Sequence, residues 1–177
     1  MLPKASEHST YAAKLPCRPF VHGGHQEHNR RGGTECVPLI AGLGKAAELA
    51  RELLPEYEQT VRPLRDALEE GILKSIPKTE LNGHKTWRLV NKTNITFNGI
   101  ESEALLILLD KEGVCASSGS ACLADSDEPS HVIRAMKPDS GASQRMIRFS
   151  LDVSNTADEV KAAVAVVRRA TDALRAS

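Results

Sequence analysis

The chain has 177 residues, of which 41% are hydrophobic and 26% are charged, and 23 basic and 23 acidic side chains give a formal net charge of zero. This balance is typical of a globular domain with a hydrophobic core, and it argues against a nucleic-acid-binding protein, which usually carries a basic excess. No apolar run approaches the ~20 residues that span a bilayer, so we expect no membrane contact.

The N-terminus and the cysteines predict a cytoplasmic protein. Residues 1–15 are polar, without a clear period, and lack the apolar stretch of a secretory signal. The four cysteines form no C-x-x-C pair, which favours reduced thiols over a disulfide framework.

The first half of the chain predicts a loop followed by helices. Val21 to Glu35 is polar and rich in glycine, so it forms neither a regular helix nor a core strand. Pro38 to Leu54 carries apolar residues at helical spacing. Pro55 should break or kink this helix. A second helical stretch then runs to about residue 70, with Gly71 as its C-terminal cap.

The second half alternates strands and helices. We expect a strand at Asn94–Phe97, a helix from Ser102 to Asp110 closed by Gly113, a short strand at Val114–Ala116, and a loop of small residues from Ser117 to Asp127.

The C-terminal quarter adds a helix, a strand and a last helix. Pro129 to Met136 predicts a helix with proline at its first position. Ile147 to Leu151 alternates, which places Arg148 on the face opposite the apolar set. Thr156 and Glu159 form a capping box at the start of the last helix. Its stripe of Val160, Val164, Val167, Thr171 and Leu174 should pack into the core. Together these elements predict an α/β fold, with a small, mostly antiparallel sheet covered by helices.

The small-residue loop carries the main candidate for chemistry. Five small residues precede Cys122 in Ser-Ser-Gly-Ser-Ala-Cys, and such a segment is expected to be mobile and exposed. A thiol there can reach a substrate and move away with a product. A surface cysteine without a role fits the residue types equally well.

This loop resembles the active-site loop of cysteine desulfurases of the nitrogen-fixation and iron–sulfur type. In that family Ser-Ser-Gly-Ser-Ala-Cys is followed by a few variable residues and then Glu-Pro-Ser-His-Val, which stands here at Glu128–Val132. Three further blocks, which begin at Gly23, Leu81 and Ile147, match in order and spacing. The resemblance covers about residues 19–174. The desulfurases that the chain resembles are part of the class-V aminotransferase family.

The resemblance implies the role of three residues. Cys122 matches the cysteine that forms a persulfide, and Arg148 matches the arginine that holds the substrate carboxylate. Thr34 matches a threonine that, in the family's homodimer, reaches the cofactor phosphate of the neighbouring subunit. Without the resemblance to the family, Arg148 would be interpreted as a surface arginine on a strand and Thr34 as a simple loop cap. The implied reaction takes sulfur from L-cysteine, gives L-alanine, and passes sulfur to a scaffold or carrier protein for iron–sulfur clusters or other pathways.

The resemblance also implies an absence. The family uses pyridoxal phosphate, bound to a lysine in a large domain upstream of the matched blocks, and that domain is missing here. Lys85 follows a histidine, as the family's lysine does, but stands in a block without a cofactor lysine, so we expect a solvated loop residue. This chain is thus expected to be the small C-terminal α/β domain of a fold-type I pyridoxal-phosphate enzyme, inactive alone.

Three segments are expected: an irregular one over residues 1–18 that does not match the family, a remnant of the large-domain junction over 19–37, and the small domain over 38–177. Smaller departures stand at His28, where arginine is usual, and at Cys36, where asparagine is usual. Cys115 replaces a small apolar residue, and as a buried cysteine it should be structural.

Three other readings compete. A non-catalytic binding or dimerisation module would keep the fold and lose the reaction. A selenocysteine lyase-like fragment is suggested by the Glu-x-Asn-x-Arg pattern that begins at Glu27. A zinc site drawn from Cys17, His22, His25, His28 and Cys36 lacks clean ligand spacing, and we expect no metal.

Overall fold

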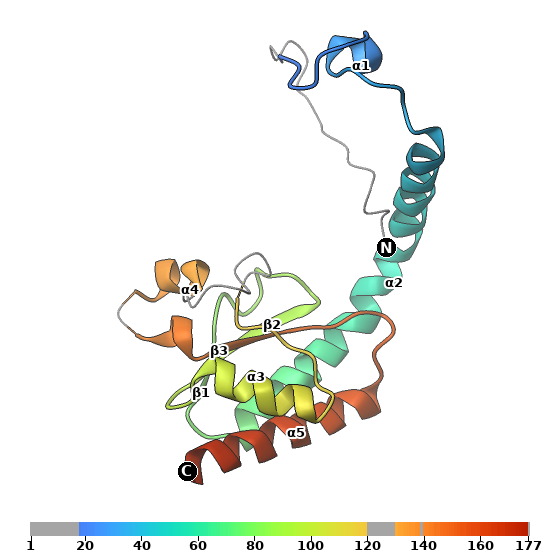
Figure 1. Cartoon of the computed structure of the whole chain (residues 1–177). Coiled ribbons are helices and arrows are strands. Elements are labelled where there is room, and N and C mark those ends of the chain that lie inside the picture. The colour runs from blue at the N-terminus through green and yellow to red at the C-terminus, as the bar shows by residue number, and fades with distance from the viewer. Residues whose placement is uncertain (1–17, 120–129, 139, 177) are drawn as a thin grey trace. The chain divides into compact units, whose positions relative to one another are not determined.

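A computed structural model describes residues 18–119, 130–138 and 140–176 (Figure 1). The chain forms two compact units, Met1–Pro55 and Glu56–Ser177, which are described separately below as the N-terminal and C-terminal units. The expectations for residues 1–15 and for most of the loop from Ser117 to Asp127 lie outside the described residues. The domain boundaries expected after residues 18 and 37 stay predictions.

The N-terminal unit begins with an irregular segment. Its one helical turn, α1 (Gln26–Asn29), has positive φ at Glu27, His28 and Asn29. A regular right-handed helix excludes such angles, so the expectation of an irregular loop between residues 21 and 35 is confirmed. The unit continues with the first part of α2 (Val37–Ser75).

The long helix α2 differs from the expected pair of shorter helices. It continues through Pro55, where a break was expected, and ends only at Ser75. Proline removes one helical hydrogen bond at a cost of about 3 kcal/mol. Beyond Pro55 the helix buries Val61, Leu68 and Ile72, and each buried apolar side chain of this size contributes about 1.5–3 kcal/mol. This burial offsets the proline.

Gly71 lies inside α2, so its expected role as a C-terminal cap is wrong. A Cβ atom added to Gly71 would lie 2.7 Å from Cγ2 and 3.2 Å from Cγ1 of Val164, on the last helix. No real Cβ contact is that short, so the missing side chain is what permits this close approach of two helices. The glycine serves packing rather than helix termination.

The sheet of the C-terminal unit has three antiparallel strands in the order β1-β2-β3. They are β1 (Thr79–Leu81), β2 (Lys92–Phe97) and β3 (Met146–Ser150). β2 and β3 pair so that Asn94 faces Arg148 and Ile95 faces Ile147. The expected antiparallel sheet is confirmed, and β1 is a strand that the sequence did not indicate.

Helices cover one face of this sheet. The second part of α2, α3 (Ser102–Lys111) and α5 (Ala157–Ala176) pack there (Figure 1). Ile95, Phe97, Ile147 and Phe149 point toward the helices because alternate side chains of a strand share a face. The helices contribute apolar side chains that meet them, among them Val61, Leu68, Ile72, Leu105, Leu109, Val160 and Val167.

The start of α5 forms the capping box that the sequence predicts. The Thr156 N–H donates to Oε2 of Glu159 at 2.8 Å, and the Glu159 N–H donates to Oγ1 of Thr156 at 3.2 Å. The hydrogen bond from the Thr156 backbone holds the pKa of the Glu159 carboxyl below its usual value. The predicted stripe is buried or half-buried along its whole length.

Two other predictions need correction. Val114–Ala116 forms no strand, and the residue that follows it, Ser117, makes an isolated bridge to Arg148 of β3. The helix predicted from residue 129 is present as α4 (His131–Met136), but Ser130 is its N-cap and its side chain accepts from the Ile133 N–H. A serine oxygen satisfies an orphan N–H, which proline cannot do, and this favours the later start.

We predict that Gly71→Ala lowers the stability of the C-terminal unit by about 1–3 kcal/mol, because the added Cβ forces Val164 and α5 apart. Urea unfolding followed by circular dichroism measures this effect. Gly44→Ala is the matched control in the same helix, since a Cβ there meets nothing within 4 Å. Helix propensity alone would make both substitutions favourable, so a stabilised Gly71→Ala would contradict the packing role.

Candidate functional site

Arg148 stands on the sheet face opposite the helices. It lies in the middle of β3, between the buried residues Ile147 and Phe149, and is itself half-buried. Its Nε is buried without a hydrogen-bond partner, and no carboxylate of the described residues pairs with its guanidinium. A planar guanidinium with free donors suits a carboxylate held by two oxygens.

The cysteine loop begins beside this arginine. The Ser117 N–H donates to the Arg148 carbonyl at 3.1 Å, and the Arg148 N–H donates to the Ser117 carbonyl at 2.7 Å. Cys122 itself lies outside the described residues. In the sequence it follows Ser117 by only a few positions.

The other end of the loop is anchored as well. The Ser130 N–H donates to the Ser143 carbonyl at 3.4 Å, within the short 3₁₀ turn η2 (Ala142–Gln144) that precedes β3. Next to this contact Ile133, Ala142 and Met146 form a small buried cluster. Both ends of the undescribed segment are therefore fixed close to the strand that carries Arg148.

A buried polar cluster that the sequence did not single out lies on the same sheet face. The Asn82 Nδ2 donates to Oδ1 of Asn94 and to Oγ1 of Thr96, both at 2.8 Å. Asn94 is the cross-strand neighbour of Arg148. The Asn82 Oδ1 is buried without a partner, so this face holds a free acceptor as well as the arginine's free donor. The sequence feature that could have indicated this cluster is the family-like block that starts at Leu81.

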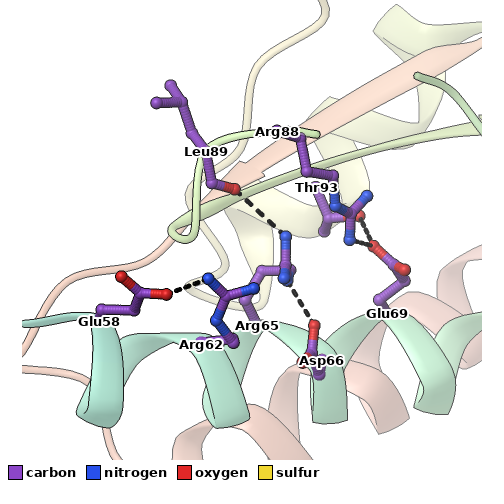
Figure 2. A network of polar contacts seen from close by, with 8 residues as sticks. All are labelled: Glu58, Arg62, Arg65, Asp66, Glu69, Arg88, Leu89 and Thr93. Atoms are coloured by element: carbon purple, nitrogen blue, oxygen red, sulfur yellow. Dashed lines mark hydrogen bonds and ion pairs between the residues drawn. The ribbon is translucent and has the colours of Figure 1, made fainter. Parts of the chain in front are cut away.

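A second polar network holds the connection between β1 and β2 against α2 (Figure 2). Arg65, only 3% exposed, pairs with Asp66 at 2.7 Å and donates to the Leu89 carbonyl at 3.2 Å. Glu69 pairs with Arg88 and accepts from Oγ1 of Thr93 at the start of β2. The network fixes the strand that lies next to Arg148.

Thr34 belongs to the N-terminal unit. It is exposed, makes no hydrogen bond with the described residues, and lies between Gly33, whose φ is 94°, and the start of α2 at Val37. The structure thus brings Ser117 and Arg148 together, and Thr34 is placed only within its own unit.

The remaining candidates are exposed. Lys85 lies in the connection between β1 and β2 as a solvated loop residue, as expected. Cys115 was expected to be buried, but it is an exposed free thiol, because the strand that would have enclosed it does not form. Cys36 is also free and exposed. Within the described ranges no three His, Cys, Asp or Glu side chains gather as a metal site would require. Among the same residues no helix is both long and apolar enough to cross a bilayer.

Residues 15–163 match the model of the aminotransferase class-V family. The match covers most of the chain, so this protein belongs to that family. The sequence resemblance is confirmed at the level of the family.

Several relatives are cysteine desulfurases. The chain is 50% identical to the cysteine desulfurase IscS of Methanosarcina thermophila over 157 residues, which are 89% of this chain and 39% of that protein. It is 48% identical to the cysteine desulfurase NifS of Azotobacter vinelandii over 143 residues, 81% of this chain and 36% of that protein. The chain therefore spans about two fifths of the length of these relatives.

A solved structure agrees with the fold. The NifS-like protein from Rickettsia africae superposes with a TM-score of 0.77 at 31% identity, over 89% of this chain and 41% of that chain. The expected small α/β domain, similar to one part of a NifS-like protein, is confirmed.

We predict that Glu69→Gln lowers the unfolding free energy by about 1–3 kcal/mol, because it leaves the half-buried Arg88 guanidinium without its counter-charge. Glu58→Gln is the matched control, since the ion pair of Glu58 with Arg62 is exposed on the same helix and should contribute less than about 0.5 kcal/mol. Urea unfolding of both variants measures the difference. Equal effects would show that the network does not anchor β2.

Proposed function

We propose that this chain is the part of a cysteine desulfurase that supplies the sulfur-accepting cysteine and the arginine that holds the substrate. The observation that carries the proposal is the two-way backbone pairing of Ser117 with Arg148. This pairing places the start of the Cys122 loop next to the unpaired guanidinium of Arg148. The identity to cysteine desulfurases across four fifths or more of the chain supports the same role.

In this proposal Arg148 binds the carboxylate of L-cysteine. Its guanidinium has no acidic partner among the described residues, and its Nε is already desolvated. A carboxylate would restore the missing hydrogen bond, and a charge-assisted pair of this kind is about twice as strong as a neutral one. The substrate's carboxylate would then lie within reach of the cysteine loop.

Cys122 is proposed to accept the sulfur. Its thiolate forms a sulfur–sulfur bond with the substrate while the substrate's carbon–sulfur bond breaks, so that the released carbon is protonated to alanine and a persulfide remains on the chain. A scaffold or carrier protein would take this sulfur, for iron–sulfur clusters or other pathways. Full-length members of the family use pyridoxal phosphate, which when bound supplies the electron sink for the bond cleavage.

Thr34 is the proposed contact to the phosphate of that cofactor, across the homodimer of the complete enzyme. An exposed hydroxyl beside the positive-φ Gly33, with no hydrogen bond to the described residues, fits an anion because it is free to donate to a phosphate oxygen. The exposed Lys85 stands in no block that would hold the cofactor covalently. We therefore propose that this chain alone does not bind pyridoxal phosphate through a lysine, and that it works in the cytoplasm with the rest of the enzyme.

The uncovered face of α2 supports a missing partner domain. No residue between Val37 and Leu54 is buried, although large apolar side chains recur there at helical spacing. Leu53 is 52% exposed and Leu54 is 65% exposed. About three fifths of the relative's length lies outside the part that this chain matches. We propose that this additional polypeptide covers the apolar face.

We predict that the purified chain, mixed with pyridoxal phosphate and L-cysteine, releases no alanine. Addition of the separately produced N-terminal part of the Methanosarcina thermophila relative should restore alanine release and place a persulfide on Cys122, detected by mass spectrometry. Cys122→Ser should abolish the persulfide, and Cys36→Ser should not. Turnover by the chain alone would refute the fragment proposal. No turnover in the mixture would favour a binding module, and preferential release from selenocysteine would favour the lyase.

We predict that Leu43→Gln together with Leu53→Gln weakens this complementation at least about tenfold, because two buried leucines would be lost from the interface. Lys45→Gln together with Glu52→Gln, on the polar side of the same helix, is the control. Circular dichroism of the isolated chains should be unchanged, since none of these side chains is buried there. An equal effect of both pairs would place the interface elsewhere.

A further inference from the structure

A pocket of about 410 Å³ opens in the C-terminal unit. It lies between the residues that follow α3, the end of β3 and the first half of α5. Its lining is mainly apolar and includes Leu68, Val114, Phe149, Leu151, Val160 and Val166. Volumes of this size, with mostly apolar walls, are typical of sites for small molecules.

The pocket exists because an expected strand does not form. Ser117 and Arg148 exchange both backbone hydrogen bonds, and the next such pair of an antiparallel ladder would be Cys115 with Ser150. No backbone hydrogen bond joins Cys115 to Ser150. The outer edge of β3 is therefore open at this point, and Cys115, which also lines the pocket, is exposed with a free thiol.

The charged side chains at the rim already have partners. Glu112 pairs with Arg169 at 2.7 Å, and Glu159 accepts from the Thr156 N–H. Among the described residues, none of the buried side-chain atoms that lack a hydrogen bond belongs to the pocket. The walls thus provide no unpaired charge or buried polar group for a hydrophilic ligand, and affinity there must come from apolar surface.

We propose that this pocket binds a small molecule with an apolar body, and that Cys115 at its mouth can hold such a molecule covalently when it carries a disulfide. The Cys115 thiolate attacks the disulfide, a new sulfur–sulfur bond forms on Cys115, and the other sulfur leaves as a thiolate that takes up a proton. This exchange needs no oxidant. The proposal does not depend on sulfur transfer to Cys122.

The test exposes the full chain to two symmetrical disulfides, one of 2-phenylethanethiol and one of 2-mercaptoethanol, under the same limiting reductant. Mass spectrometry of peptides gives the fraction modified at Cys115 and at Cys36, which is an exposed thiol that does not line the pocket. The ratio of Cys115 to Cys36 modification should be about tenfold higher with the phenylethyl reagent, because only Cys115 can bury the ring. Equal ratios would overturn the proposal.

Filling the pocket gives the matched variant. Ala163 lines the pocket and is partly buried, so Ala163→Leu should remove the preference for the phenylethyl reagent. Ala135→Leu, on α4 outside the pocket, should retain it. Circular dichroism confirms folding, and Ala162→Phe, at an exposed lining position, replaces Ala163→Leu if that variant unfolds. A preference that persists in the filled variant, or slow amide exchange at Cys115 and Ser150 that shows a closed ladder, would refute the site.

Discussion

The alternation of side chains along β3 is the constraint on which the rest of this domain depends. Successive residues of a strand point to opposite faces, so Ile147 and Phe149 enter the core while Arg148 stands on the other side. A slip of one residue in the pairing with β2 would bury the guanidinium and expose both apolar side chains. The register that stabilises the core is therefore the register that positions the arginine.

Local signals in the sequence were sufficient where one short stretch contains all the interacting groups. The capping box at Thr156 and Glu159 forms as predicted, because both of its hydrogen bonds join residues three apart. Pro55 and Gly71 were misread because their usual local effect is outweighed by contacts far along the chain. Burial beyond Pro55 extends the helix, and the close approach of Val164 gives Gly71 another purpose. The three-residue strand β1 is too short to show an alternation.

The candidate site was predicted only in part, because some of its contacts also join residues that are far apart in the sequence. Family blocks identified Cys122, Arg148 and Thr34 as individual residues, and these roles stay proposals. The blocks did not indicate that Asn82 would link Asn94 and Thr96 on the face of Arg148, since hydrogen bonds between separate strands follow from pairing register. The burial expected for Cys115 was wrong because it assumed a complete ladder along the edge of β3.

The chain is anchored beside Arg148 at Ser117 and at Ser130. These two anchors determine the effective concentration, near Arg148, of a group carried between them. A group on a short tether beside its target acts as if it were present at an effective concentration on the order of millimolar. A free cellular thiol would have to reach that level to compete for the substrate that Arg148 is proposed to hold. In the proposed reaction, the first sulfur transfer would then be a first-order process within the assembled enzyme. Only the later handover to an acceptor would slow as both proteins become scarce.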